Sequence, residues 1–101
     1  MHLIKVKKQR NQKMIFISLE GHAGYAQEGY DIVCAAVSIL FQNLMFSIKS
    51  LTTGELECKK KNNMKQIEIR NLSDQVELLV NSFFIGIQKI AVVYPENVRI
   101  V

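Results

Sequence analysis

The sequence predicts an α+β fold: a two-layer sandwich of two helices on a mainly antiparallel sheet, in the order β-β-α-β-β-α-β. Three observations lead to this prediction. Residues 32–51 and 74–94 carry apolar side chains at three- and four-residue steps, which is typical of amphipathic helices. The shorter segments alternate apolar and polar residues, as strands with one buried face do. Residues 56–61 and 64–70 are separated by two asparagines, which indicates an antiparallel hairpin.

Length and composition limit the class of protein. With 101 residues we expect one domain over residues 1–101, large enough for one core. A hydrophobic share of 49%, with one proline and five glycines, excludes a disordered or low-complexity chain. No run of about 18 uncharged apolar residues occurs, and the charged start lacks a signal-peptide core. We therefore expect a cytoplasmic protein with no membrane partner.

The N-terminal part is predicted to form two strands. Residues 2–7 alternate apolar side chains with lysines, which indicates a half-buried strand, and residues 8–13 form a polar turn. Residues 14–19 are almost continuously apolar, which is typical of a strand covered on both faces. We expect the domain's own helices on one face, with a partner subunit as the candidate cover for the other.

A loop over residues 21–30 connects this strand to the first helix. Its glycines and tyrosines are Gly21, Gly24, Gly29, Tyr25 and Tyr30. At about ten residues it exceeds the two to six of an ordinary strand-to-helix connection. We interpret the loop as a lid that orders over a substrate, with a plain connection as the alternative.

The helices have recognisable ends. The first spans about 32–51, has an apolar surface on more than one side, and ends with Gly54 as its expected C-cap. The second begins near Asp74, which has the capping-box relation to Glu77, with Ser73 as an alternative cap. Gly86 interrupts the second helix and marks a close packing contact.

The remaining elements are strands. Asparagine tolerates positive φ, which suits the two-residue turn between residues 56–61 and 64–70. Cys58 shares a face with Leu56, and we interpret it as a small core residue. Val98, Ile100 and Val101 fit a short terminal strand.

Cys34 is the candidate nucleophile. Asp31 is a natural N-cap, which places Cys34 in the first helical turn, where backbone N–H groups lack partners and the helix dipole favours negative charge. A lowered thiol pKa is expected there. The backbone N–H groups of Cys34 and Ala35 are candidate donors to an oxyanion. The alternative is a buried helical cysteine without chemistry.

His22 is the candidate general acid and base, twelve residues upstream of Cys34. A surface or loop-ordering histidine is the alternative, and His2 has no partner in the sequence. Asp31 caps the helix or, in addition, orients His22. Ser38 follows Cys34 by one turn, and it either hydrogen-bonds within the site or bonds back to its own helix.

Other chemistries lack their motifs. The chain has no phosphate-binding loop, no dinucleotide fingerprint and no GxSxG elbow. Its cysteines and histidines do not have metal-ligand spacing, so we expect no metal and no cofactor. The net charge of +4 comes from lysines and arginines around predicted turns, without interleaved aromatic residues. We therefore expect no specific nucleic-acid partner.

Gly21-His22-Ala23, Gly29 and the run DIVCAAVS at 31–38 resemble the ribosomal-processing cysteine protease family, Prp. Members are small bacterial proteins that trim an N-terminal extension from the large-subunit ribosomal protein numbered twenty-seven. The resemblance implies catalytic Cys34 and His22, the same fold, a homodimer, and a substrate with aromatic residues before the cut. It also implies a substrate loop, comprising Gly21, Ala23, Gly24, Tyr25, Gly29 and Tyr30.

The predicted function is therefore a cysteine endopeptidase that acts on a ribosomal protein extension. Two alternatives belong to other classes. One is a non-catalytic binding module, associated with ribosomes or RNA through its basic turns. The other is a structural dimeric α/β protein in which the motif only closes a loop.

Overall fold

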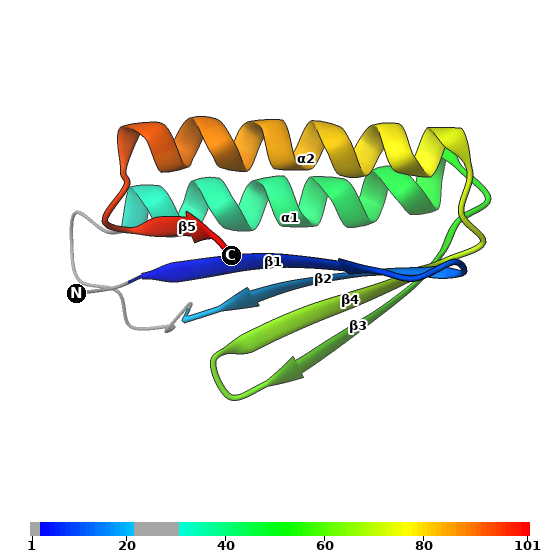
Figure 1. Cartoon of the computed structure of the whole chain (residues 1–101), viewed down its shortest axis with the longest axis horizontal. Coiled ribbons are helices and arrows are strands. Elements are labelled where there is room, and N and C mark those ends of the chain that lie inside the picture. Colours follow the sequence, from blue (N-terminus) through cyan, green and yellow to red (C-terminus); the bar gives the residue numbers. More distant parts are fainter. Residues whose placement is uncertain (1–2, 22–30) are drawn as a thin grey trace.

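One five-stranded sheet carries both helices on the same face (Figure 1). The computed structural model describes residues 3–21 and 31–101, without the side chain of Asp31. The elements are β1 Ile4–Arg10, β2 Met14–Glu20, α1 Asp31–Leu51, β3 Glu55–Lys61, β4 Met64–Arg70, α2 Asp74–Val93 and β5 Val98–Ile100. The strands lie in the order β3-β4-β2-β1-β5, and only the β1–β5 pair is parallel. The predicted fold class and element order are confirmed.

The core lies between the sheet and the helix layer. On β2 the alternate residues Ile15, Ile17 and Leu19 are buried, as the period of a strand requires. Both helices contribute residues at three- and four-residue steps: Val33, Val37, Phe41, Leu44 and Ile48 from α1, and Val76, Val80, Phe83 and Ile87 from α2. The helices touch each other at Gly86, where an added Cβ would lie 2.9 Å from Leu40 Cδ1. The close contact predicted at Gly86 is confirmed.

The helix layer covers one face of β2, as predicted, and a partner subunit as the cover of its second face stays a prediction. In the described part of the chain, this second face carries Phe16 among charged neighbours and has no second layer of helices. Glu68 lies opposite Phe16, and its carboxylate is 3.1 Å from Lys59 Nζ and 3.3 Å from Arg70 Nη2. Phe16 itself is half-buried.

The first strand is longer than its sequence pattern predicts. β1 continues to Arg10, and the turn is confined to residues 11–13. Lys8 and Arg10 belong to the strand because their backbones pair with Ile17 and Ile15 of β2, and their side chains reach α2. Lys8 Nζ lies 5.8 Å from the centroid of the Phe84 ring, and Arg10 forms an ion pair with Glu77.

The caps predicted at the end of α1 and at the start of α2 differ in detail from those in the structure. Gly54 is not a left-handed C-cap, since Gly21 is the only described glycine with positive φ. A Cβ on Gly54 would instead lie 2.8 Å from Val76 Cγ2, so the position requires a close approach of the chain. The cap of α2 is Ser73 rather than Asp74: its hydroxyl oxygen accepts the N–H of Val76 at 3.2 Å.

The β3–β4 hairpin forms as predicted, with Asn62 in the left-handed region at φ +54°. The prediction that Cys58 is a core residue is wrong, because its side chain is exposed. Cys58 pairs with the buried Ile67 and so faces the helix side of the sheet. However, β3 is an edge strand, and in Figure 1 the hairpin diverges from the helix layer. Cys58 therefore lies beyond the cover of α1.

The outer face of the helix layer is apolar. Each helix exposes three large side chains at seven-residue spacing, and these six residues are 58–78% exposed: Ile32, Ile39 and Phe46 from α1, and Leu78, Ile85 and Val92 from α2. The predicted burial of α1 on more than one side is therefore wrong within this single chain. Both helices are also long and apolar enough to cross a membrane, a test that core helices of soluble proteins pass as well.

Candidate active site

Cys34 lies in the first turn of α1, as the capping signal at Asp31 predicts. Val33 and Val37 are buried against the sheet and fix the rotation of the helix. Cys34 is half-buried and packs against the edge of this core. The residue therefore belongs to a helix while part of its surface is open to solvent.

The flank of α1 that carries Cys34 is turned away from α2. Leu40 marks the side that meets α2, and Cys34 is six residues earlier, roughly 120° around the helix from Leu40 at 3.6 residues per turn. Ser38 follows Cys34 by one turn on that flank and is half-buried. The structure thus brings Cys34 and Ser38 onto the same surface.

Gly21 fixes the point at which the chain leaves β2. Its φ is +90°, a conformation that residues with a side chain rarely adopt. A Cβ at this position would collide with the carbonyl oxygen of Leu3. The N–H of Gly21 donates to the carbonyl oxygen of Asn63 at the tip of the β3–β4 hairpin, at 3.1 Å. Only glycine fits these constraints without strain.

The remaining predicted site residues lie outside the described part of the chain. They are His22, Ala23, Gly24, Tyr25, Gly29 and Tyr30, and of Asp31 only the backbone is described. The backbone N–H groups of Cys34 and Ala35 lie at the start of α1. Figure 1 shows that the start of α1, the end of β2 and the hairpin tip all lie at the same end of the molecule.

Sequence reasoning missed two contacts at this end. Leu3 and Asn63 both meet Gly21 through their backbone carbonyls, although they are 18 and 42 residues away in the sequence. Carbonyl groups carry no residue-type signal, so no sequence pattern would have found them. Of the geometry at Gly21, only the positive φ is suggested by the residue type.

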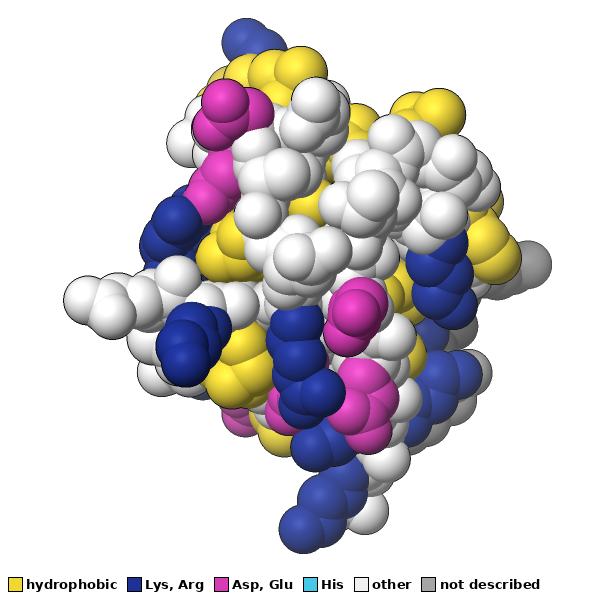
Figure 2. All heavy atoms as spheres, turned by 90° about the vertical axis from the view of Figure 1, so that its right-hand side faces the viewer, with side chains coloured by type: hydrophobic (Ala, Val, Ile, Leu, Met, Phe, Trp, Pro, Cys, Tyr) yellow, Lys and Arg dark blue, Asp and Glu magenta, His cyan; other side chains and the backbone are white. Residues whose placement is uncertain are grey.

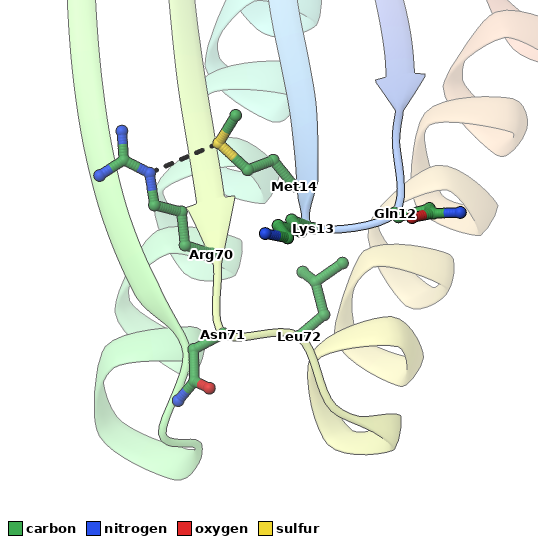
Figure 3. A pocket seen from close by; sticks show the side chains of 6 residues that line it. All are labelled: Gln12, Lys13, Met14, Arg70, Asn71 and Leu72. Atoms are coloured by element: carbon green, nitrogen blue, oxygen red, sulfur yellow. Dashed lines mark hydrogen bonds between the residues drawn. The ribbon is translucent and has the colours of Figure 1, made fainter.

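A cavity lies at the opposite end of the molecule. It has a volume of about 480 Å³ and is lined by Gln12, Lys13, Met14, Arg70, Asn71 and Leu72 (Figure 3). Arg70 Nε donates to Met14 Sδ at 3.4 Å across one wall. The lining has no thiol, imidazole or carboxylate, so this cavity lacks the groups for nucleophilic cleavage of a peptide bond.

The surface at this far end carries charges of both signs. Figure 2 shows lysine and arginine side chains interspersed with acidic ones and with apolar residues. A phosphate backbone is normally met by a single-sign basic patch, which this face does not have. Within residues 3–21 and 31–101, no group of three histidine, cysteine or acidic side chains could hold a metal ion.

Comparison with known proteins identifies the family. A family model described as cysteine protease Prp matches residues 1–99. The chain belongs to the Prp family of cysteine proteases. The resemblance drawn from residues 21–38 is therefore confirmed, and the chain is an enzyme of the cysteine protease class.

Individual relatives extend this result over nearly the whole chain. The ribosomal processing cysteine protease Prp of Staphylococcus aureus is 28% identical over 91 residues, which cover 87% of this chain and 86% of that protein. A crystal structure of the S. aureus protease with a substrate peptide has a TM-score of 0.80 at 25% identity, covering 98% of both chains. A second structure, with a covalently linked product peptide, has a TM-score of 0.78 at 27% identity and covers 97% of both chains.

Proposed function

We propose that this protein is a cytoplasmic endopeptidase that removes the N-terminal extension of the large-subunit ribosomal protein numbered twenty-seven. The observation that carries the proposal is the match of the Prp family to residues 1–99, with Cys34 in the first turn of α1. The S. aureus relatives are described as ribosomal processing proteases, which supports the substrate class. The half-buried position of Cys34 suits a thiol that must be both oriented and reachable.

In this proposal Cys34 is the nucleophile and His22 the general acid and base. The Cys34 thiolate attacks the carbonyl carbon of the scissile bond and forms a tetrahedral oxyanion. Backbone N–H groups at the start of α1, including those of Cys34 and Ala35, stabilise the negative charge. His22 then donates its proton to the leaving amine, and the C–N bond breaks. The substrate's N-terminal fragment remains bound to Cys34 as a thioester.

Hydrolysis of that thioester completes the cycle. His22, now neutral, takes a proton from water, and the resulting hydroxide attacks the thioester carbonyl. Collapse of the second tetrahedral intermediate releases the carboxylate fragment and restores the Cys34–His22 pair. A covalently linked product peptide in the S. aureus protease supports a covalent route.

Neighbouring residues have supporting roles in the proposal. Asp31 caps α1 and orients His22, and Ser38 hydrogen-bonds within the site from the same flank as Cys34. The loop residues Gly21, Ala23, Gly24 and Gly29 follow the substrate backbone. Tyr25 and Tyr30 form the walls for the aromatic residues that precede the cut.

We further propose that the protein is a homodimer that associates through the outer face of the helix layer. Helices of 21 and 20 residues are about 30 Å long and pack 8–10 Å apart, so this face covers roughly 600 Å². That approaches the ~800 Å² per partner of a stable interface. α1 carries no charged residue from 32 to 48, so two copies of its outer surface would not repel each other.

Sedimentation velocity tests the dimer. Ile39→Glu combined with Ile85→Glu places charges at the centre of the outer face, and we expect a monomer. Gln9→Glu adds a charge to the opposite, open face of the sheet and leaves the dimer intact. A monomeric wild type, or a dimeric double variant, would contradict the proposed interface.

Cleavage of the extended ribosomal protein tests the enzymatic function. Wild type and Cys58→Ala remove the extension, whereas Cys34→Ala and His22→Ala do not. Cys58→Ala is the matched control, because it removes the other thiol of the chain. Mass spectrometry of a stalled reaction locates the acyl group on Cys34. Equal cleavage by all four proteins, or by none, would refute the assignment.

A further inference from the structure

Basic residues that are far apart in the sequence lie near one another on the open face of the sheet, opposite the helices. Ile4 and Val6 are buried beneath the helices, so the lysines that alternate with them on β1 belong to the open face. Strand pairing places one row across the sheet from β5 to β3: Arg99, Lys5, Glu20, Met64 and Lys61. The adjacent row runs from β1 to β3: Lys7, Ser18, Gln66 and Lys59. We call these two rows the basic face.

The charge of the basic face is hardly neutralised. All its lysines and its arginine are exposed, and Glu20 is the only carboxylate in the two rows. Lys59 forms an ion pair with Glu68 of the next row, at 3.1 Å. Within the described residues, the other cations of the basic face form no ion pair. At the hairpin tip, Lys60 lies directly opposite Lys65, an arrangement of like charges that destabilises a strand pair.

Protection of the sheet edge explains only part of this charge. Lysines on an edge strand hinder pairing with another chain, and β3 is an edge strand. However, β1 lies between β2 and β5, so Lys5 and Lys7 do not guard an edge. The other half of the open face carries acidic residues as well, among them Glu57 and Glu68. The excess of positive charge is therefore confined to the half nearer the hairpin tip.

The cations of the basic face form two columns. Lys5 and Lys7 on β1 are about 7 Å apart along the strand, and Lys59 and Lys61 on β3 have the same separation. The columns are three strand spacings apart, which is about 14 Å. Such an array suits a polyanion whose charges repeat along its length.

The residue types of the basic face favour phosphate over an acidic protein. The cores of protein–protein interfaces are poor in lysine and rich in aromatic residues. The basic face has the opposite composition, because four of its five cations are lysines and neither row contains an aromatic side chain. Contacts to nucleic-acid phosphates are made largely by lysine and arginine. Without aromatic residues to stack on bases, the contact would be independent of sequence.

We propose that the basic face binds the phosphate backbone of RNA independently of its sequence, and thereby holds the Cys34 end of the molecule beside RNA-associated substrates. The choice of RNA among polyanions rests on the function proposed above, since a ribosomal protein is a partner of RNA. The basic face lies on the opposite side of the sheet from α1 (Figure 1). RNA bound there leaves the flank with Cys34 and Ser38 uncovered.

Fluorescence anisotropy with a labelled oligouridylate of about 20 nucleotides tests the proposal. For the wild-type full chain, we expect log K to fall with log salt at a slope of about −3, as for about four phosphate contacts on a single strand. Lys7→Gln combined with Lys61→Gln removes one cation from each column. We expect a slope of about −1.5 and an affinity at least about tenfold lower at ~50 mM salt.

The matched control is Lys13→Gln combined with Lys49→Gln. Both lysines are exposed and lie at the other end of the molecule, and their removal lowers the net charge by the same amount. Because the distance exceeds the screening length, this variant keeps the affinity of wild type within about twofold. Equal losses of affinity in the two double variants, or no salt-dependent binding by wild type, would overturn the proposal.

A second pair of variants tests the position of the charge in the opposite direction. Glu20→Gln removes the carboxylate from the basic face, and we expect the RNA affinity to rise. Glu55→Gln makes the same change in net charge at the far end of β3, where we expect no rise. An equal rise in both variants would show that net charge alone governs binding and would contradict a defined site.

Two further measurements distinguish other occupants of this face. If a polyglutamate peptide binds as tightly as RNA and depends on the same lysines, the face binds acidic proteins instead. If sedimentation velocity shows a wild-type dimer that separates in the Lys7→Gln and Lys61→Gln double variant, the face belongs to a second subunit. Failure of the proposed function appears in a different assay: wild type does not cleave the extended ribosomal protein, or Cys34→Ala cleaves it equally well.

Discussion

The two ends of the sheet are built in different ways. At the far end, polar side chains close the turns over short distances in the sequence, and one of them, Asn71, also donates through Nδ2 to the carbonyl oxygen of Thr53, 18 residues away. Asn11 Oδ1 accepts the N–H groups of Lys13 and Met14, both at 2.9 Å, and Ser73 caps α2 in the same manner. At the end with Cys34, the contacts join backbone groups of distant segments, such as Gly21 to Asn63 and Ile4 to Asn97.

Because of this difference, we expect the two ends to contribute differently to stability and to activity. Local side-chain caps stabilise their own element and leave its neighbours unchanged. Backbone contacts between distant segments fix the relative positions of β1, β2 and the hairpin, which is what a catalytic pair on two segments requires. Substitutions at the far end should therefore reduce stability alone, whereas those at the Cys34 end should reduce activity beyond any loss of stability.

The largest expected effect comes from the two cysteines. Cys34→Ala removes the proposed nucleophile and lowers kcat/KM on the order of 10⁴-fold or more. Cys58→Ala changes an exposed thiol on the edge strand and leaves kcat/KM within about twofold, as expected for a surface substitution. Peptide-cleavage kinetics and thermal melts of both variants provide the test. Comparable losses in the two would contradict the role of Cys34.

The glycines at the two ends give the next contrast. Gly21→Ala forces a side chain into a positive φ and against Leu3, at a cost of about 1–3 kcal/mol in unfolding free energy. It also lowers kcat, because the root of the catalytic loop shifts. Gly54→Ala overpacks Val76 and costs a similar ~1–3 kcal/mol. Urea titrations measure both losses. We expect Gly54→Ala to retain the kcat of wild type. A fall in its kcat as large as that of Gly21→Ala would contradict the proposed difference between the two ends.

The cap of α2 should give a smaller effect. Ser73→Ala removes the acceptor for the Val76 N–H and lowers the unfolding free energy by about 1 kcal/mol. Ser73→Asp restores an acceptor and serves as the control. Chemical denaturation measures both. A drop in kcat at full occupancy of the folded state would show that the far end is coupled to the site.

The smallest effect is expected at the surface ion pair between Arg10 and Glu77. The two side chains are 45% and 27% exposed, so the pair contributes about 0.2–1 kcal/mol and is screened by salt. Glu77→Gln removes the pair and keeps the shape of the side chain. Urea titrations at low and high salt should show the loss only at low salt. A salt-independent loss would point to packing along Lys8 and Phe84 instead.

Much of the fold is predictable because its signals are local. The helix periods, the two-residue hairpin and the cap of α2 each depend on residues within a few positions of one another. The errors arise where neighbours in space decide the outcome. Cys58 alternates correctly with Leu56, but its exposure depends on how far α1 covers an edge strand. Phe16 has the residue type of a buried position, yet its cross-strand neighbours are the polar residues Glu68 and Gln9.

The candidate site likewise has features that local sequence signals predict and features that depend on distant contacts. Cys34 was found from its residue type and its place at a helix start, which the structure confirms, and its role as nucleophile stays a proposal. Its orientation away from α2 follows from the contact of Leu40 with Gly86, which no pattern near Cys34 contains. Asn63 and Leu3 meet Gly21 through backbone carbonyl groups, which every residue possesses, so their residue types give no signal.

By itself, the sequence determined the elements, their order and the family, and it suggested Cys34 and His22 as the catalytic pair, because these depend on residue type and short spacing. Only the tertiary structure decided which face each helix leaves exposed and what holds Gly21 in place. Those features depend on sheet twist, helix rotation and backbone hydrogen bonds between distant segments. Gly21 illustrates the division: its residue type permits a positive φ, and the tertiary structure places the Leu3 carbonyl where a side chain would lie and the Asn63 carbonyl as acceptor of its N–H.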